Sequence, residues 1–143
     1  MRRQNISLTV DAVIFYSSKN QTLLLLIQRK NDPFKEQWAL PGGFVEDDED
    51  LETAALRELK EETGIALETC EQLYAFGKPG RDPRGRTVSI AHVGFVTHKI
   101  TPRADDDAGD ARWFDVNNLP NLAFDHQEII NLAISRFLPD HPQ

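Results

Sequence analysis

The stretch GGFVEDDEDLETAALRELKEETGI, residues 42–65, joins a glycine pair to an acidic loop and then to an amphipathic segment that ends at another glycine. Asp50 suits the position that caps the amino end of a helix, and Gly64 suits the left-handed residue that follows the last turn. The stretch therefore predicts a helix over residues 50–63 with a tight turn before it. The order of its acidic residues guides the interpretation of the rest of the chain.

Three carboxylates of this predicted helix lie along one side of it. At about 100° per residue, Glu61 and Glu62 fall within about 60° of Glu58, so the three side chains form an acidic stripe. Leu56 and Leu59 point away from the stripe, toward the predicted core. On charge alone, a solvated acidic face is the commoner explanation of such a stripe.

A bound divalent cation would relieve the repulsion within the stripe. Arg57 can pair with Glu61 one turn later, which relieves only part of it. Oxygen ligands suit Mg²⁺, with Mn²⁺ as the alternative, and the sequence offers no set of cysteines and histidines for zinc. Because Mg²⁺ is usually held by few carboxylates together with substrate phosphates, the stripe points to a phosphate-containing substrate.

Composition narrows the class of protein. The chain has 143 residues and a formal net charge of −7, which predicts one soluble domain over residues 1–143 and argues against nonspecific binding to nucleic acid. Its longest apolar run, Leu23–Ile27, is too short to span a membrane. A single cysteine, Cys70, and an amino terminus without a cleavage-site pattern favour the cytoplasm. A homodimer is left open.

The remaining segments alternate between strand-like and helix-like patterns, which predicts an α/β layered domain with a mixed sheet. The predicted strands cover residues 7–16, 22–29, 68–76, 87–97 and 111–116, and a closing amphipathic helix covers 125–138. We expect Trp38, Trp113 and Phe114 to lie in the core, with stacking on a base as the alternative, and His126 to have a structural role rather than reach the site.

The order of residues in the acidic stretch resembles the Nudix hydrolase signature. Gly43 is followed after five residues by Glu49, and after seven more by RELKEETGI, residues 57–65. The resemblance implies an α/β/α sandwich with a mixed, curved sheet between helices. It also implies hydrolysis within the pyrophosphate of a nucleoside diphosphate derivative, assisted by a divalent metal.

The resemblance also assigns roles to residues of the signature. The implied metal ligands are the Gly42 carbonyl, Glu58, Glu61 and Glu62. Arg57 would orient the carboxylates, and Gly43 would make the turn that returns Glu46 and Glu49 to the helix.

A carboxylate must also accept the proton of the attacking water. The candidates are Glu61 within the signature and Asp107 outside it, with Asp106 and Asp110 beside Asp107. A solvated loop is the alternative explanation of these aspartates.

The loop GKPGRDPRGR, residues 77–86, is basic in an otherwise acidic chain. Guanidinium groups fit phosphate oxygens, so Arg81 and Arg84, with Asp82 between them, are candidate substrate-binding residues. A rigid hairpin with solvated arginines is the alternative.

The segments GRDPRGRTVSIAHV, residues 80–93, and LPNLAFDHQEII, residues 119–130, look like the ADP-ribose pyrophosphatase branch of the family. This resemblance implies conversion of ADP-ribose to AMP and ribose 5-phosphate. The alternatives are a pyrophosphatase for another nucleotide sugar or a nucleoside triphosphate, and a catalytically weak ligand sensor. Transcriptional regulators in the same branch carry a DNA-binding domain, and we expect none after the closing helix and no nucleic-acid partner.

Overall fold

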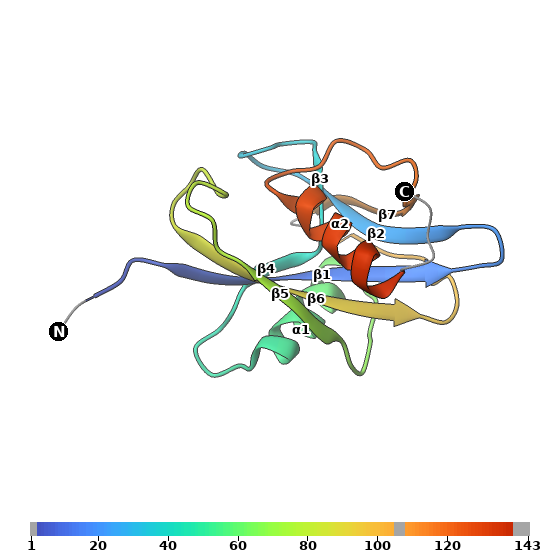
Figure 1. Cartoon of the computed structure of the whole chain (residues 1–143), viewed down its shortest axis with the longest axis horizontal. Coiled ribbons are helices and arrows are strands. Elements are labelled where there is room, and N and C mark those ends of the chain that lie inside the picture. The colour runs from blue at the N-terminus through green and yellow to red at the C-terminus, as the bar shows by residue number, and fades with distance from the viewer. Residues whose placement is uncertain (1–2, 105–107, 139–143) are drawn as a thin grey trace.

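The computed structural model describes residues 3–104 and 108–138 and contains one mixed β-sheet with helices on both faces (Figure 1). The elements, in chain order, are β1 Ser7–Ser17, β2 Thr22–Arg29, β3 Trp38–Ala39, β4 Gly42–Phe44, α1 Leu51–Thr63, β5 Glu71–Phe76, β6 Thr87–Val96, β7 Ala108–Asp115 and α2 His126–Phe137.

The sheet is organised around β1. The main path runs β3-β2-β1-β6-β5, while β4 pairs with β1 and β7 pairs with β2. The β1–β6 pair is parallel and runs from Ser7 opposite Thr87 to Tyr16 opposite Val96. The other pairs are antiparallel. The predicted mixed sheet is therefore confirmed.

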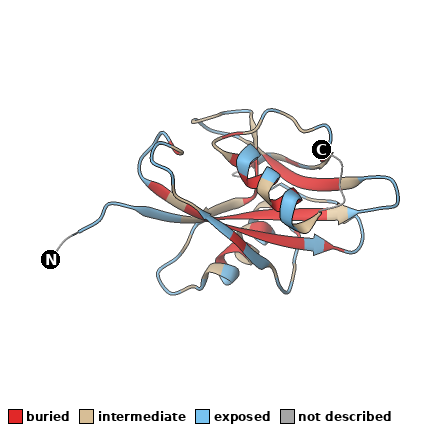
Figure 2. Ribbon diagram, viewed as in Figure 1, coloured by how far each residue is buried: buried red, intermediate tan, exposed pale blue. Residues whose placement is uncertain are grey.

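Alternating side chains of the central strands supply two separate cores. On β1, Val13 and Phe15 are buried in the same apolar cluster as Ile130 of α2. Ala12 and Ile14 point to the other face and share a cluster with Leu59 of α1. This period of two places one helix on each face of the sheet, as the α/β/α prediction requires. Figure 2 shows the buried residues concentrated in the central strands.

Helix α1 begins and ends where the sequence predicts. The Asp50 side chain accepts a hydrogen bond from the backbone N–H of Leu51, and Gly64 has a φ of 75° and donates its N–H to the Lys60 carbonyl. The left-handed conformation at this position favours glycine. The predicted core residue Leu59 is buried, and Leu56 is half-buried.

Two predicted strands have different limits in the structure. Residues 68–70 precede β5 instead of belonging to it, because the Cys70 N–H donates to the Glu52 side chain of α1 rather than to a neighbouring strand. Strand β7 begins at Ala108, before the predicted start at residue 111, and its pairing with β2 extends to Arg29.

The described residues contain no helix that is long and apolar enough to cross a membrane. The predicted core aromatics pack as expected. Trp38 and Phe114 meet edge to face at 4.8 Å, and the Trp113 indole donates to the Ile100 carbonyl. These three residues line none of the pockets described below.

Candidate functional site

Arg57 on α1 contacts three carboxylates and one carbonyl. Its Nε and Nη2 atoms bind both oxygens of Glu49 at 2.7 and 2.6 Å. Its Nη1 atom lies 2.8 Å from Glu58 and 3.1 Å from Glu61, and Nη2 also donates to the Phe44 carbonyl at 3.1 Å. The predicted Arg57–Glu61 contact is confirmed. Gly43 lies in strand β4, opposite Val10, rather than in the predicted turn, and the chain turns back toward the helix later, where the Glu49 N–H donates to the Glu46 carbonyl.

This arrangement shifts the pKa values of the groups involved. The hydrogen bonds from Arg57 lower the pKa of Glu49 to about 2. Burial raises the pKa of Glu58, and the hydrogen bond from Arg57 opposes that shift. The hydrogen bond to Glu49 also raises the pKa of Arg57, so its guanidinium stays charged. One permanent cation thus holds several carboxylates close together.

The residues predicted to bind metal line one pocket of about 390 Å³, here called the carboxylate pocket. Its lining residues are Gly42, Gly43, Phe44, Glu46, Arg57, Glu58, Glu61 and Glu62. A Cβ at Gly43 would lie 2.6 Å from the Glu58 carboxyl carbon, so only glycine leaves this space to the carboxylate.

The chemistry of the carboxylate pocket fits a hard divalent cation, because carboxylate and carbonyl oxygens are the ligands that Mg²⁺ and Mn²⁺ prefer. Within residues 3–104 and 108–138, however, no three His, Cys, Asp or Glu side chains stand close enough together to form a metal cluster. Glu58 and Glu61 bind the guanidinium of Arg57 instead.

The glycine pair is fixed between β1 and α1. Gly42 donates its N–H to Oε1 of Glu62 at 2.7 Å, and the preceding Pro41 carbonyl accepts from Ala12 at 2.8 Å. A Cβ at Gly42 would lie 2.6 Å from an oxygen of Asp11 and even closer to the Val10 carbonyl. Close backbone approach therefore requires glycine here, and it places the peptide next to Glu62.

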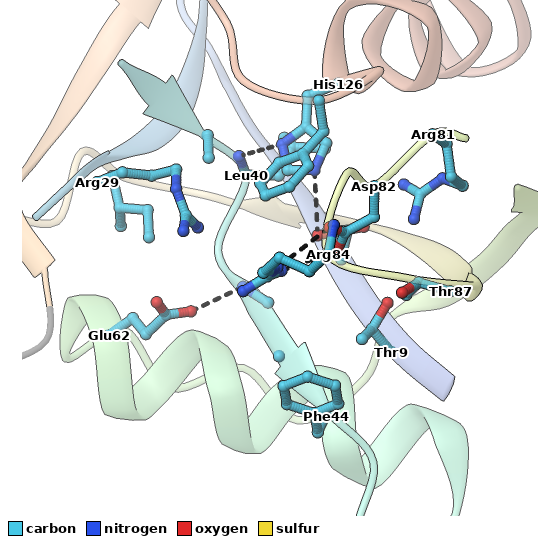
Figure 3. A pocket seen from close by; sticks show the side chains of 16 residues that line it. Thr9, Arg29, Leu40, Phe44, Glu62, Arg81, Asp82, Arg84, Thr87 and His126 are labelled. Atoms are coloured by element: carbon cyan, nitrogen blue, oxygen red, sulfur yellow. Dashed lines mark hydrogen bonds and ion pairs between the residues drawn. The ribbon is translucent and has the colours of Figure 1, made fainter. Parts of the chain in front are cut away.

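A second pocket of about 190 Å³, here called the arginine pocket, lies beside the first (Figure 3). Its polar and aromatic lining includes Thr9, Asp11, Arg29, Glu62, Arg81, Asp82, Arg84, Thr87, Phe44, Phe124 and His126. Gly42, Gly43, Phe44 and Glu62 line both pockets. The acidic and basic regions therefore share one wall.

The predicted substrate residues of the basic loop already have partners within the protein. Arg81 makes two bonds to Asp125, at 2.9 and 2.7 Å, and its side chain is only 5% exposed. Arg84 makes two bonds to Asp82, at 3.1 and 2.8 Å, and these lower the pKa of Asp82. The alternative of a hairpin with solvated arginines is wrong for Arg81, because Asp125 at the start of α2 binds it.

Arg29, at the end of β2, was not predicted as a site residue. Its Nε donates to the Pro33 carbonyl at 2.7 Å, and its guanidinium lies 4.9 Å from the centre of the Phe124 ring. No carboxylate of the described residues forms an ion pair with it. Burial lowers the pKa of Arg29, and repulsion from Arg84 adds to that effect. An anion in the arginine pocket would therefore be stabilised by Arg29.

A buried polar cluster lies at the back of the arginine pocket and was also missed. The Leu40 N–H donates to Nδ1 of His126 at 3.0 Å, which places the ring proton on Nε2, 3.6 Å from Asp11. The Ser89 hydroxyl donates to the other oxygen of Asp11. Burial lowers the pKa of His126, so the neutral ring is favoured. His126 thus has the predicted structural role and also lines the pocket.

Of the predicted proton acceptors, the structure describes Glu61 and Asp110, and only Glu61 of these two lines a pocket of the site. Asp107 and Asp106 lie outside the described residues. Asp110 accepts from the Ala111 N–H and from Arg112, and it lines neither pocket. Glu61, on the exposed side of α1, lines the carboxylate pocket.

Comparison with known proteins gives the same family from sequence and from structure. Residues 7–133 match the NUDIX domain model. The chain is 48% identical over 124 residues to an ADP-ribose pyrophosphatase of Methanocaldococcus jannaschii, with 87% of this chain and 70% of that protein covered. It is 38% identical over 133 residues to an ADPR responsive transcriptional repressor of Acinetobacter baylyi, covering 90% of this chain and about half, 53%, of the repressor.

A solved structure extends the similarity to three dimensions. The NUDIX domain of a Shewanella oneidensis protein, NrtR, complexed with ADP ribose, superposes with a TM-score of 0.87 at 35% identity. The superposition covers 94% of this chain and 90% of that domain. The match over residues 7–133, together with the acidic signature on α1 and the mixed sheet between two helices, shows that this chain belongs to the NUDIX family.

Proposed function

We propose that the protein hydrolyses the pyrophosphate bond of ADP-ribose, giving AMP and ribose 5-phosphate, with Mg²⁺ bound at the acidic stripe and Mn²⁺ as a substitute. The observation that carries this proposal is the wall shared by the two pockets. Gly42, Gly43, Phe44 and Glu62 line both, so a diphosphate could lie between the carboxylates of α1 and the guanidinium of Arg29.

Similarity to proteins of known activity supports the choice of substrate. The Methanocaldococcus jannaschii relative is named an ADP-ribose pyrophosphatase, and the Shewanella oneidensis NUDIX domain was crystallised with ADP ribose. Both similarities extend over most of this chain. A substrate that combines a nucleotide, a diphosphate and a sugar also suits a site with separate acidic and basic regions.

In this proposal the acidic stripe holds the cation. Glu58, Glu61 and Glu62 would hold it together with the Gly42 carbonyl. When bound, the cation lowers the pKa of water and offsets negative charge on phosphate oxygens. Arg57 keeps the carboxylates in place through the contacts described above.

The reaction breaks one P–O bond of the diphosphate. The oxygen of water bonds to one phosphorus as that phosphorus releases the bridging oxygen. Glu61 accepts the proton from the water in our proposal, because it lines the carboxylate pocket on its exposed side. Asp107 remains the alternative acceptor.

The basic residues have two different proposed roles. Arg29 binds a phosphate directly, because its guanidinium lines the arginine pocket without a carboxylate partner among the described residues. Arg84, which is half exposed, lies beside the same space and can add a second contact. Arg81 and Asp82 hold the loop in place through their ion pairs and shape the binding site.

Ligand sensing with little turnover is a second candidate function. It is favoured by the similarity to the ADPR responsive repressor of Acinetobacter baylyi. The complete set of Arg57, Glu58, Glu61 and Glu62 favours catalysis over sensing, because binding alone does not require a site that activates water.

A substrate panel would test the proposal. ADP-ribose, other nucleotide sugars, dinucleotides and nucleoside triphosphates would each be incubated with the protein and Mg²⁺, and kcat/KM and products would be measured. We expect ADP-ribose to have the highest kcat/KM and to yield AMP. A higher kcat/KM for another compound would identify that compound as the preferred substrate. Tight binding of ADP-ribose without formation of products would favour ligand sensing.

A further inference from the structure

Phe44 is a large aromatic residue that the fold leaves exposed. Its relative exposure is 58%, the highest among the exposed large apolar residues described. It lines both the arginine and the carboxylate pockets, and also a neighbouring groove, here called the Asn5 groove. Figure 3 shows the ring at the rim of the arginine pocket, on the side of Thr9 and Thr87. An exposed apolar side chain at the junction of three cavities contributes little to the core.

The backbone of Phe44 is fixed although its side chain is exposed. Phe44 pairs with Thr9 of β1, and its carbonyl accepts a hydrogen bond from Arg57 at 3.1 Å. The next residue, Val45, donates its N–H to the Leu8 carbonyl at 3.1 Å. The ring is thus presented from an ordered strand, which reduces the entropy lost when a ligand packs against it.

The other phenylalanine in the arginine pocket is already occupied by contacts within the protein. The Phe124 ring lies 4.9 Å from the Arg29 guanidinium and 5.5 Å from that of Arg84, and Phe34 meets it edge to face at 4.8 Å. Phe44, in contrast, makes no ring-stacking or cation–π contact with any other described residue. Among the described residues that line these cavities, Phe44 alone therefore offers a free aromatic face.

The arginine pocket alone is too small for the whole substrate, and a neighbouring groove offers further space beside Phe44. The arginine pocket holds about 190 Å³, below the roughly 300 Å³ at which pockets for drug-sized ligands begin. The Asn5 groove adds a space of about 200 Å³ and shares Phe44, Asp82, Arg84 and Thr87 with the arginine pocket. Besides Phe44, its lining includes the amide of Asn5 and the hydroxyls of Ser7 and Thr87, groups that can bind the edge of a base.

We propose that the exposed ring of Phe44 is the surface on which the nucleobase of the substrate stacks, with the edge of the base in the Asn5 groove. This assignment rests on the proposed hydrolysis of a nucleoside diphosphate derivative and identifies the residue that selects its nucleoside half. Stacking uses the face of the base, so it distinguishes substrates with a base from those without one. The diphosphate then continues from Phe44 toward Glu62 and Arg29.

The kinetic test compares ADP-ribose with the same molecule lacking adenine, in which two ribose 5-phosphates are joined through their phosphates. Phe44→Ala and Phe44→Leu should each raise KM for ADP-ribose by about five- to a hundredfold, the range expected for base–aromatic stacking. KM for the substrate without a base should change less than about twofold. Tyr74→Ala, at another exposed aromatic residue, on β5, is the matched control and should leave both values unchanged.

Three kinetic outcomes would overturn the assignment. Unchanged KM for ADP-ribose in Phe44→Ala would show that the ring does not contact the substrate. Equal increases in KM for the two substrates would show that the ring supports the site without contacting the base. A KM for ADP-ribose in Phe44→Leu equal to that of wild type would show that apolar volume suffices and that no aromatic face is needed.

A binding experiment separates this assignment from the proposed reaction. In Phe44→Trp, the tryptophan fluorescence should be quenched by AMP and not by ribose 5-phosphate, whereas Tyr74→Trp should show no quenching above wild type with either compound. If wild type does not hydrolyse ADP-ribose but Phe44→Trp shows this pattern, the proposed reaction fails and the stacking surface stands. Equal responses to the two compounds, or none to AMP, would overturn the stacking surface even in an active enzyme.

Discussion

The backbone N–H of Leu40 donates to Nδ1 of His126 over 3.0 Å, so the first residue of α2 holds the segment that leads into the glycine pair. Two residues later, Gly42 donates its own N–H to Glu62 of α1. The two helices lie on opposite faces of the sheet, and this segment connects them at the site. A buried histidine that the proposed reaction does not use directly thus binds the chain two residues before the contact to Glu62.

Replacing His126 tests the contribution of its bond to Leu40. His126→Phe removes the acceptor and leaves the Leu40 N–H unsatisfied, which should lower the free energy of unfolding by about 1–3 kcal/mol. His126→Asn keeps an acceptor near the position of Nδ1 and should be less destabilised. Urea denaturation of the three proteins measures the difference. Equal stabilities of the Phe and Asn variants would show that the bond to Leu40 contributes nothing measurable.

The Glu49–Arg57 pair should make stability depend on pH under acidic conditions. Hydrogen bonds from Arg57 lower the pKa of Glu49 from 4.5 to about 2 in the folded state. Between these values the unfolded state binds the proton and the folded state does not, so stability falls as pH falls from 4.5 toward 2. Glu49→Gln removes this contribution and should show a shallower loss of stability.

Denaturation of wild type and Glu49→Gln at a series of pH values measures this effect. The stability difference between them should shrink as the pH decreases through the window. A difference that stays constant over this range would mean that Arg57 does not hold Glu49 ionised.

Gly43→Ala tests the space that the structure reserves for Glu58. The added Cβ would lie 2.6 Å from the Glu58 carboxyl carbon, and the end of a flexible side chain can move aside. The fold should survive, while displacement of a metal ligand should lower turnover at least about tenfold. Gly77→Ala is the matched control, because its Cβ would meet Val88 at an ordinary 3.5 Å. Turnover of the Gly43 variant equal to that of the control would remove Glu58 from the metal site.

Arg29→Ala tests the proposed phosphate contact. Charge-assisted hydrogen bonds are worth roughly 1.5–3 kcal/mol, so KM for ADP-ribose should rise about ten- to a hundredfold. Arg112→Ala provides the same change of charge at an exposed residue that lines neither pocket. Steady-state kinetics of the two variants measure this effect. Equal values of KM would show that Arg29 does not bind the substrate phosphate.

The parts of the fold that sequence predicts well are those determined by nearby residues. The limits of α1 follow from Asp50 and Gly64, which act on the helix ends next to them. A continuous apolar run likewise identifies β2, where Leu23–Ile27 are all buried. The start of β5 was missed, because the Cys70 N–H is bound by Glu52, a residue 18 positions earlier in the chain. No local pattern reports such a contact.

The contacts of the site that were predicted join residues close together in the sequence, whereas contacts between residues far apart in the sequence were missed. The carboxylates of α1 share one helix, so their spacing alone brings them together, and Arg57 reaches Glu61 within one turn. Arg81 is bound by Asp125, 44 residues away, which the composition of its loop cannot indicate. Arg29 ends an apolar strand and resembles an ordinary exposed terminus. Asp11, a polar residue within an apolar strand, was the one available signal for the buried polar cluster around His126.

Release of AMP from ADP-ribose by wild type, Glu61→Gln and Glu62→Gln at saturating Mg²⁺ tests the central claim most directly. The control is Lys60→Gln, an exposed residue in the same turn of α1. Metal binding and proton transfer are each typically worth at least about a hundredfold, so both glutamine variants should lose that much turnover while Lys60→Gln stays near wild type. Near-normal AMP release by both glutamine variants would contradict the assignment of the acidic stripe as the catalytic metal site.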